Sequence, residues 1–416
     1  MSLPQRGRSV ADIVADLSAM RGDDARWQEG RTFGIVYDGG PEVHEAALAA
    51  TTMYLHENAL NTLAVPSLGQ IQREVVGAMA ELLHGDEASG FMTSGGTESI
   101  LMAVKAARER GRLERGIERG HILLAESAHA AFHKAAHYFG LDVTKVPVGD
   151  DWRADAAAMA DGLTDSTVLV VGSAPQYPQG VIDPIEDLAR LAGEVGASFH
   201  TDACMGGFVL PFAERLGESV PPWDFRVPDV TSISLDVHKL GYAPKGASII
   251  LHRSKELRRH QTFVFDDWLG GLYASPNMQG SRAGAPMAAA WAVMQRLGVD
   301  GYTELTRVTL DAARRLVTGV RQIDGLTVLG EPEAQLAAIA ADPATGDDLD
   351  VFAVGDALGD RGWYLDRQHR PDSLHLTVSA GNAPIIDEFL TDLGSVSTEV
   401  AGRRPAERPA TYSTLE

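Results

Sequence analysis

Two ionisable residues that could do chemistry each follow a short apolar segment of this chain. Lys239 comes after the segment at 230–235, and Asp202 comes directly after the segment at 197–201. A lysine amine can form a Schiff base with a carbonyl group when desolvation or nearby cations lower its pKa. Taken singly, a lysine is usually a solvated surface charge and an aspartate usually caps a loop or helix. The two residues therefore indicate chemistry only in combination with other groups.

A pair of glycines, Gly95 and Gly96, precedes the helical pattern at 100–110, with Thr97 beside them. Glycines at a helix entry let backbone N–H groups approach an anion, and the helix dipole favours its negative charge. The alternative is an ordinary capped helix, with Ser94 or Thr97 as the cap. Because the loop lacks Gly-Lys-Ser/Thr, it is not a nucleotide P-loop.

Two further histidines could take part. His129 follows an apolar segment, and an imidazole there could stack on an aromatic ring. A histidine at a helix start is otherwise more often a cap or an exposed side chain, and spacing does not separate His129 from His133 and His137. His238, next to the lysine, could contact a phosphate or a substrate.

In chain order, the glycine loop, His129, Asp202 and Lys239 match what a pyridoxal 5′-phosphate (PLP) site requires. In such a site Lys239 would hold the cofactor as a Schiff base. Asp202 would raise the pKa of the pyridine nitrogen and keep it protonated, which makes the ring an electron sink. The combination predicts a PLP enzyme. The histidines show no His-Glu-x-x-His or other metal-ligand spacing, so we predict no metal.

The elements that must position these groups alternate between strands and helices. Amphipathic helical stretches, such as 185–195 after Asp183-Pro184, separate several of the strands. This alternation of strands and helices predicts an α/β fold with a largely parallel sheet. Asp202 would then lie at the edge of the sheet that the carboxyl ends of the strands form. The predicted strands are 121–125, 142–148, 167–173, 197–201, 230–235 and 247–252.

The pattern changes towards the end of the chain, where a helical region at 285–322 is followed by a smaller α+β unit. The sequence predicts an N-terminal arm at 1–60, a large PLP-binding domain at 61–300, a small C-terminal domain at 301–400 and a disordered tail at 401–416. Within the small domain, the predicted strands are 325–329, 336–340 and 373–379, and the predicted helix is 350–361.

Composition limits the possible partners and the location. The chain of 416 residues has a net charge of −21, which disfavours nucleic acid and anionic lipid. An anionic substrate must then be captured by a locally positive pocket. Cys204 is the single cysteine, which excludes an intrachain disulfide, and we expect it to be a small buried hydrophobe. We see no signal peptide, membrane anchor or membrane span, and we expect a cytoplasmic protein.

Several stretches resemble the sphingosine-1-phosphate lyase family, within the group II decarboxylase-like superfamily of fold-type I PLP enzymes. The similarity covers roughly residues 30–300, and the long motif after Lys239 is specific to the lyase-like branch. It implies the fold-type I PLP-dependent transferase fold, with a large, mostly parallel domain and a smaller α+β C-terminal domain. The resembling stretches are 93–103, 127–132, 178–184, 202–208, 238–246, 267–276 and 280–282.

The resemblance implies a role for each cofactor residue. Lys239 would be the Schiff-base lysine, Asp202 the pyridinium partner and His129 the stacking residue, while Gly95, Gly96 and Thr97 would hold the cofactor phosphate. Gly280 and Ser281 would reach that phosphate from a neighbouring subunit, which implies a homodimer with shared active sites.

The residues that surround the substrate phosphate in the family are only partly matched. The chain has Tyr37, Asn58 and Lys245 at the expected positions. Ile35 stands at the usual alanine position, and Asn61 stands where the family has a phosphate-binding histidine. An amide can donate a hydrogen bond to phosphate but cannot become cationic. The cofactor residues thus follow the family pattern, while the substrate pocket is altered.

By resemblance, we expect a carbon–carbon lyase that cleaves a phosphorylated long-chain 2-amino-3-hydroxy base, such as sphingosine-1-phosphate, into an aldehyde and phosphoethanolamine by retro-aldol chemistry. Lys239, His238 and Tyr37 are candidates for the general base, and the sequence does not rank them. Three alternatives stay open: decarboxylation of an L-amino acid, cleavage of a different β-hydroxy amine, and a catalytically silent binding protein on the same fold.

Overall fold

The computed structural model describes residues 3–22, 24–345, 349–404 and 410. Most of the predicted disordered tail at 401–416 lies outside these residues. Among the described residues, no helix is both long enough and apolar enough to cross a lipid bilayer.

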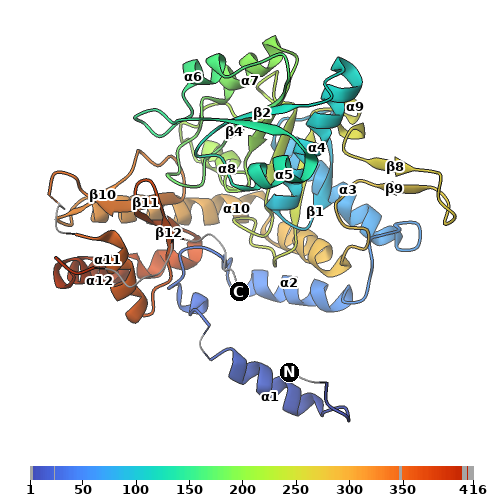
Figure 1. Ribbon diagram of the computed structural model, residues 1–416. Helices are drawn as coiled ribbons and strands as arrows, with labels where there is room; N and C mark the ends of the chain where they lie inside the picture. Colours follow the sequence, from blue (N-terminus) through green and yellow to red (C-terminus); the bar gives the residue numbers. More distant parts are fainter. Residues whose placement is uncertain (1–2, 23, 346–348, 405–409, 411–416) are drawn as a thin grey trace.

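A seven-stranded sheet forms the centre of the molecule (Figure 1). Its strands stand in the order β1-β7-β6-β5-β4-β2-β3; those from β6 to β3 pair in parallel, while β7 is antiparallel to both neighbours. The predicted parallel α/β fold is confirmed, although β1 was not foreseen. The bounds are β1 (Ser89–Thr93), β2 (His121–Ala125), β3 (Asp142–Val146), β4 (Thr167–Ser173), β5 (Ser198–Asp202), β6 (Ser232–Leu235) and β7 (Ser248–His252).

The central strands β2, β4, β5, β6 and β7 are buried along their whole length, as expected for a sheet covered by helices on both faces. Pro184 precedes α7 as predicted, and the acidic residues of its first turn favour the helix dipole. The helices are α4 (Gly96–Arg115), α5 (Ala131–Phe139), α6 (Ala156–Asp161), α7 (Ile185–Glu194), α8 (Leu210–Arg215) and α9 (Lys255–Arg259).

The N-terminal region contributes α1 (Val10–Met20), a 3-10 turn at Trp27–Glu29, α2 (Pro41–Met53) and α3 (Pro66–Leu82). Helix α1 buries none of its residues and lies apart from the body of the molecule (Figure 1).

A long helix and a second sheet complete the chain. Helix α10 (Gly284–Val320) bends at Gly298, where φ is +56°. The four-stranded antiparallel sheet has the order β10-β11-β13-β12, and its edge strand β12 was not foreseen. The domain boundaries themselves remain a prediction. The elements are β10 (Leu326–Val328), β11 (Leu336–Ala341), α11 (Val351–Asp360), β12 (Asp366–Gln368), β13 (Ser373–Thr377), a 3-10 helix at Ala380–Ile385 and α12 (Ile386–Glu399).

A hairpin of β8 (Phe263–Phe265) and β9 (Tyr273–Ser275) projects from the large sheet (Figure 1). Its tip and flanks expose large apolar side chains, among them Val264, Trp268 and Leu269.

Candidate active site

One cavity, with a volume of about 330 Å³, brings together the four groups that the sequence singled out. This volume is of the size that small-molecule sites have. It lies beyond the carboxyl end of β5, where ligands bind to open α/β sheets. The cavity is lined by the loop 94–98, Ile100, His129, Asp202 with Cys204, Asp236, and His238 with Lys239.

The glycine loop forms the amino end of α4. Gly95 is the residue that precedes this helix, and no side chain caps it. A Cβ atom on Gly96 would lie 2.8 Å from Oδ2 of Asp236 and 2.9 Å from Sγ of Cys204, so a side chain does not fit there. Ser94 does not act as a cap, because its hydroxyl and its backbone N–H both donate to the Glu98 carboxylate, at 2.8 and 2.6 Å. The loop is therefore a backbone cradle suited to an anion.

Asp202 is the last residue of β5, and its side chain is buried. Its Oδ1 atom accepts hydrogen bonds from the Ser234 hydroxyl and from the Cys204 backbone N–H, both at 3.1 Å. These bonds fix the orientation of the carboxylate. Cys204 is buried as expected, and burial raises the pKa of its thiol well above the ordinary value.

Lys239 lies in the turn that follows β6. The chain turns there because the backbone N–H of Tyr242 donates to the carbonyl of Lys239, at 2.9 Å. The Nζ atom of Lys239 is 3.0 Å from Oδ2 of Asp236, whose side chain is 1% exposed.

Asp236 is a site residue that the sequence reasoning missed, although its spacing from the lysine was visible. Burial by itself raises the pKa of Asp236, but attraction to Lys239 and His238 and a hydrogen bond from Ser248 outweigh burial, so the pKa lies below its ordinary value. The carboxylate is therefore charged and faces the lysine.

His238 has a defined tautomer. Its Nδ1 atom accepts hydrogen bonds from the backbone N–H groups of Ala247 and Gly246, at 3.1 and 3.3 Å. The proton of the neutral ring must then sit on Nε2, which lies 3.8 Å from Oδ2 of Asp236. Desolvation lowers the pKa of His238 to about 4, so the ring is neutral near pH 7.

The structure separates His129 from its neighbours. His129 is half-buried and lines the cavity, whereas His133 and His137 are exposed on α5. Its Nδ1 atom accepts a hydrogen bond from the backbone N–H of Ala131 at 3.1 Å. Desolvation lowers the pKa of His129, and the charge of Asp202 opposes this shift only in part.

Tyr37 and Lys245 lie together beside the lysine turn. The Nζ atom of Lys245 is 4.6 Å from the centre of the Tyr37 ring and donates a hydrogen bond to the His238 carbonyl at 2.7 Å. Desolvation, with added repulsion from Lys239, lowers the pKa of Lys245 to about 8.

The other predicted residues do not line this cavity within the described chain. Asn58 donates a hydrogen bond to the Ser281 hydroxyl at 3.1 Å, and Asn61 accepts one from the Leu63 backbone N–H at 2.9 Å. Gly280 lies near the hydroxyl of Tyr273, and Ile35 is 51% exposed with a φ of +61°.

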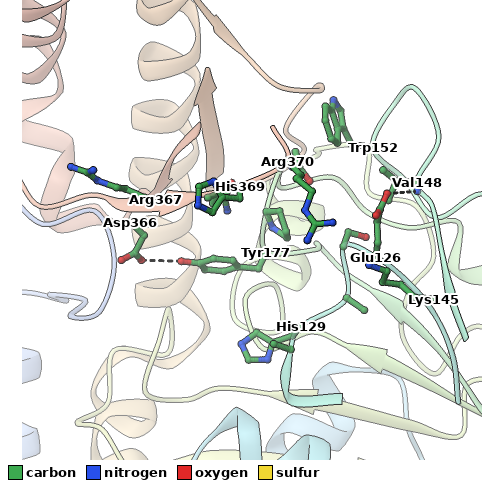
Figure 2. Close-up of a pocket in the computed structure, with 16 residues that line it drawn as sticks. Glu126, His129, Lys145, Val148, Trp152, Tyr177, Asp366, Arg367, His369 and Arg370 are labelled. Atoms are coloured by element: carbon green, nitrogen blue, oxygen red, sulfur yellow. Dashed lines mark hydrogen bonds between the residues drawn. The ribbon is translucent and has the colours of Figure 1, made fainter. Parts of the chain in front are cut away.

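A second cavity, of about 340 Å³, adjoins the first, and His129 lines both (Figure 2). Tyr177, which the sequence reasoning also missed, stands in its wall. Its hydroxyl donates to Oδ2 of Asp366 at 3.0 Å, and its ring stacks on His375 with 3.9 Å between ring centres. No motif around Tyr177 marked it in advance, because its partners come from the small sheet.

Comparisons with known proteins agree with this arrangement. The family model described as the pyridoxal-dependent decarboxylase conserved domain matches residues 33–340. Sphingosine-1-phosphate lyase of Arabidopsis thaliana is 43% identical over 400 residues, covering 94% of this chain and 72% of the relative. Sphingosine-1-phosphate lyase 1 of Rattus norvegicus is 39% identical over 403 residues, covering 96% and 70%.

A solved structure shows the same likeness in three dimensions. A sphingosine-1-phosphate lyase of Burkholderia pseudomallei superposes with a TM-score of 0.91 at 39% identity, covering 97% of this chain and 93% of the other. The family model and the relatives show that the chain belongs to the sphingosine-1-phosphate lyase family of pyridoxal-dependent decarboxylase-like enzymes and is a PLP-dependent lyase, in agreement with the lysine, buried carboxylate, histidine and glycine loop that line one cavity.

Proposed function

We propose that this enzyme cleaves the bond between C2 and C3 of a phosphorylated long-chain 2-amino-3-hydroxy base, such as sphingosine-1-phosphate, and releases an aldehyde and phosphoethanolamine. The observation that carries the proposal is the meeting of Lys239, Asp202 and His129 on one cavity beside the glycine cradle. The relatives named for this activity share 39–43% of their residues with the chain.

The residues of the cavity fit PLP. The uncapped amino end of α4 with Gly96 would hold the phosphate, Asp202 the ring nitrogen, His129 the ring face and Lys239 the aldehyde carbon. When bound, PLP supplies a protonated ring that stabilises negative charge on the carbon next to the substrate amine.

The contacts of His238 bear on the choice of general base. A base must accept the proton of the substrate's β-hydroxyl, but Nδ1 of His238 already accepts two backbone hydrogen bonds. Its Nε2 carries the proton, so His238 is suited to donate a hydrogen bond and not to accept a proton. Lys239 and Tyr37 remain as candidates, together with Tyr177, which lies in the adjoining wall.

The test compares the purified holoenzyme with a Lys239→Ala variant. Both are incubated with sphingosine-1-phosphate and, separately, with a panel of L-amino acids. We expect a long-chain aldehyde from the phosphorylated base with the native enzyme alone. Carbon dioxide from an amino acid, without aldehyde from the base, would replace the lyase function by the decarboxylase alternative.

We also propose a homodimer in which residues 280–281 of one subunit reach the cofactor phosphate of the other. Supporting this, Gly280 and Ser281 do not line the cavity of their own chain, and the nearby β8–β9 hairpin exposes apolar side chains. Light scattering should give the mass of a dimer. The cytoplasmic location is likewise a proposal, to be tested by cell fractionation.

A further inference from the structure

A buried histidine, His200, is joined to the cofactor cavity by hydrogen bonds. It precedes Asp202 by two residues on β5, so both side chains project from the same face of that strand. On the neighbouring strand β6, Ser232 and Ser234 stand opposite His200 and Asp202 in the parallel register. The four side chains therefore lie side by side on one face of the sheet, and all four are buried.

Both ring nitrogens of His200 are hydrogen-bonded to serine hydroxyls. Nδ1 lies 2.8 Å from Oγ of Ser232, and Nε2 lies 3.0 Å from Oγ of Ser234. The Ser234 hydroxyl in turn donates to Oδ1 of Asp202 at 3.1 Å, and its oxygen also accepts from the Cys204 thiol at 3.4 Å. A continuous chain of hydrogen bonds thus runs from Ser232 to Asp202, which lines the cavity.

The imidazole of His200 is neutral near pH 7. Desolvation lowers the pKa of His200 to about 4, and attraction to Asp202 opposes this shift only in part. A neutral imidazole carries a single ring proton, so one of its nitrogens donates a hydrogen bond and the other accepts one.

The charge of Asp202 decides which nitrogen carries that proton. The Ser234 hydroxyl has one proton, and a hydrogen bond to a carboxylate is stronger than one to a neutral ring. Ser234 therefore donates to Asp202 and accepts from Nε2 of His200, while Nδ1 accepts from Ser232. All three bonds then point towards the carboxylate. Because each bond polarises the next, the chain favours negative charge on Asp202.

Another buried histidine of the same sheet shows what a purely structural contact looks like. Nδ1 of His121, on β2, lies 3.0 Å from the hydroxyl of Thr167. Thr167 is the first residue of β4, at the edge of the sheet opposite to the cavity. The His200 chain differs because it ends on a carboxylate that faces the cofactor site.

We propose that His200 is a positioning residue of the PLP site, which acts through Ser234 to hold the Asp202 carboxylate in place and to favour its charged form. A carboxylate that turned away or took up a proton could not keep the ring nitrogen of the cofactor protonated. The inference concerns the cofactor and holds for any substrate of the enzyme.

Equilibrium dialysis of PLP with the full-length protein tests the chain. His200→Leu removes both ring nitrogens and should raise the Kd of PLP about three- to tenfold. His200→Gln should restore part of the affinity, because its amide N–H can still donate to Ser234. The matched control is His121→Leu, which should leave the Kd unchanged. A native Kd in His200→Leu would contradict our inference.

A double-mutant cycle separates positioning through Ser234 from a general effect on the fold. In a Ser234→Ala background the chain is already interrupted, so adding His200→Leu should raise the Kd of PLP little further. Additive effects of the two substitutions would show that His200 acts by another route, and the inference would be wrong. Urea unfolding of each variant verifies that the proteins compared are folded.

Nitrogen NMR spectroscopy of protein with isotope-labelled histidine tests the chain in the native sequence, without a substitution that could impair folding. The signal of His200, assigned by its absence from His200→Gln, should show the ring proton on Nε2 at neutral pH. A proton on Nδ1 would direct the hydrogen bonds away from Asp202 and overturn the proposal.

Discussion

The ammonium of Lys239 lies 3.0 Å from the carboxylate of Asp236, a side chain that is 1% exposed. The pair is held in place by a hydrogen bond from Ser248 to Asp236 and by the neutral ring of His238. In this arrangement the reactive amine has a charged partner of its own, next to the glycine cradle. The relationship makes Asp236 a positioning residue for the lysine and leads to the first prediction.

Asp236→Asn should destabilise the cofactor-free protein by about 3 kcal/mol, because removing one member of a buried ion pair leaves the other charge without compensation. Urea unfolding measures the change. The control is Ser248→Ala, which removes the hydrogen bond to the same carboxylate, together with those to the Leu235 carbonyl and the Ser99 hydroxyl, and keeps the ion pair, so it should cost less, roughly 1–2 kcal/mol. Equal effects of the two variants would mean that the ion pair itself contributes nothing.

Gly96→Ala should weaken PLP binding at least about tenfold. The new Cβ atom would lie 2.8 Å from Oδ2 of Asp236, so the loop must shift at the place where it would hold the phosphate. Equilibrium dialysis of PLP measures the affinity. Gly77→Ala is the matched control, because Gly77 is an exposed helical glycine with no atom within 4 Å of the added Cβ. That variant should bind PLP normally, and normal binding by Gly96→Ala would argue against the cradle.

Asp202→Asn should lower kcat by roughly a hundredfold or more, since an amide keeps the shape of the carboxylate but not the charge that holds a proton on the ring nitrogen. KM should change much less. Steady-state aldehyde release gives both constants. Ser234→Ala removes a hydrogen bond to Asp202 and keeps its charge, so it should cost far less. A Ser234→Ala loss as large as that of Asp202→Asn would show that orientation matters and charge does not.

The pH dependence of phosphoethanolamine binding tests whether Lys245 holds the substrate phosphate. The pKa of Lys245 is lowered to about 8, so this lysine loses its charge as pH rises through that value. If Lys245 is a phosphate ligand, the Kd of phosphoethanolamine should rise as the pH passes through about 8. An arginine keeps its charge throughout that range, so a Lys245→Arg variant should show a weaker dependence on pH. Calorimetric titration of the holoenzyme measures both, and identical pH profiles of the two proteins would contradict the role of Lys245.

The cofactor-binding residues could be predicted from the sequence because each of them belongs to a local sequence pattern. Gly95 and Gly96 open a helix, Asp202 ends a strand, and Lys239 follows one. In a parallel sheet the carboxyl ends of the strands meet at one edge, so local patterns were enough to predict that these groups converge. For the same reason the parallel strands were found, since buried apolar runs carry their own signal.

Other features depended on pairing between distant segments. The antiparallel strand β1 and the edge strand β12 are defined by partners far away in the chain, β7 and β13. The tertiary structure also separated the three histidines. His129 precedes α5 and lines the cofactor cavity, whereas His133 and His137 lie on exposed positions of α5.

Taken by itself, the sequence predicted the cofactor chemistry and the α/β fold, because each rests on residue types and local spacing, and it indicated the family through the resemblance of several stretches. The tertiary structure decided the partners of those residues. It placed Asp236 against Lys239, gave His238 its tautomer, and linked His200 to Asp202 through Ser234. Burial and electrostatic pairing are properties of three-dimensional neighbours, so no pattern along the chain could show which charges are compensated and by which groups.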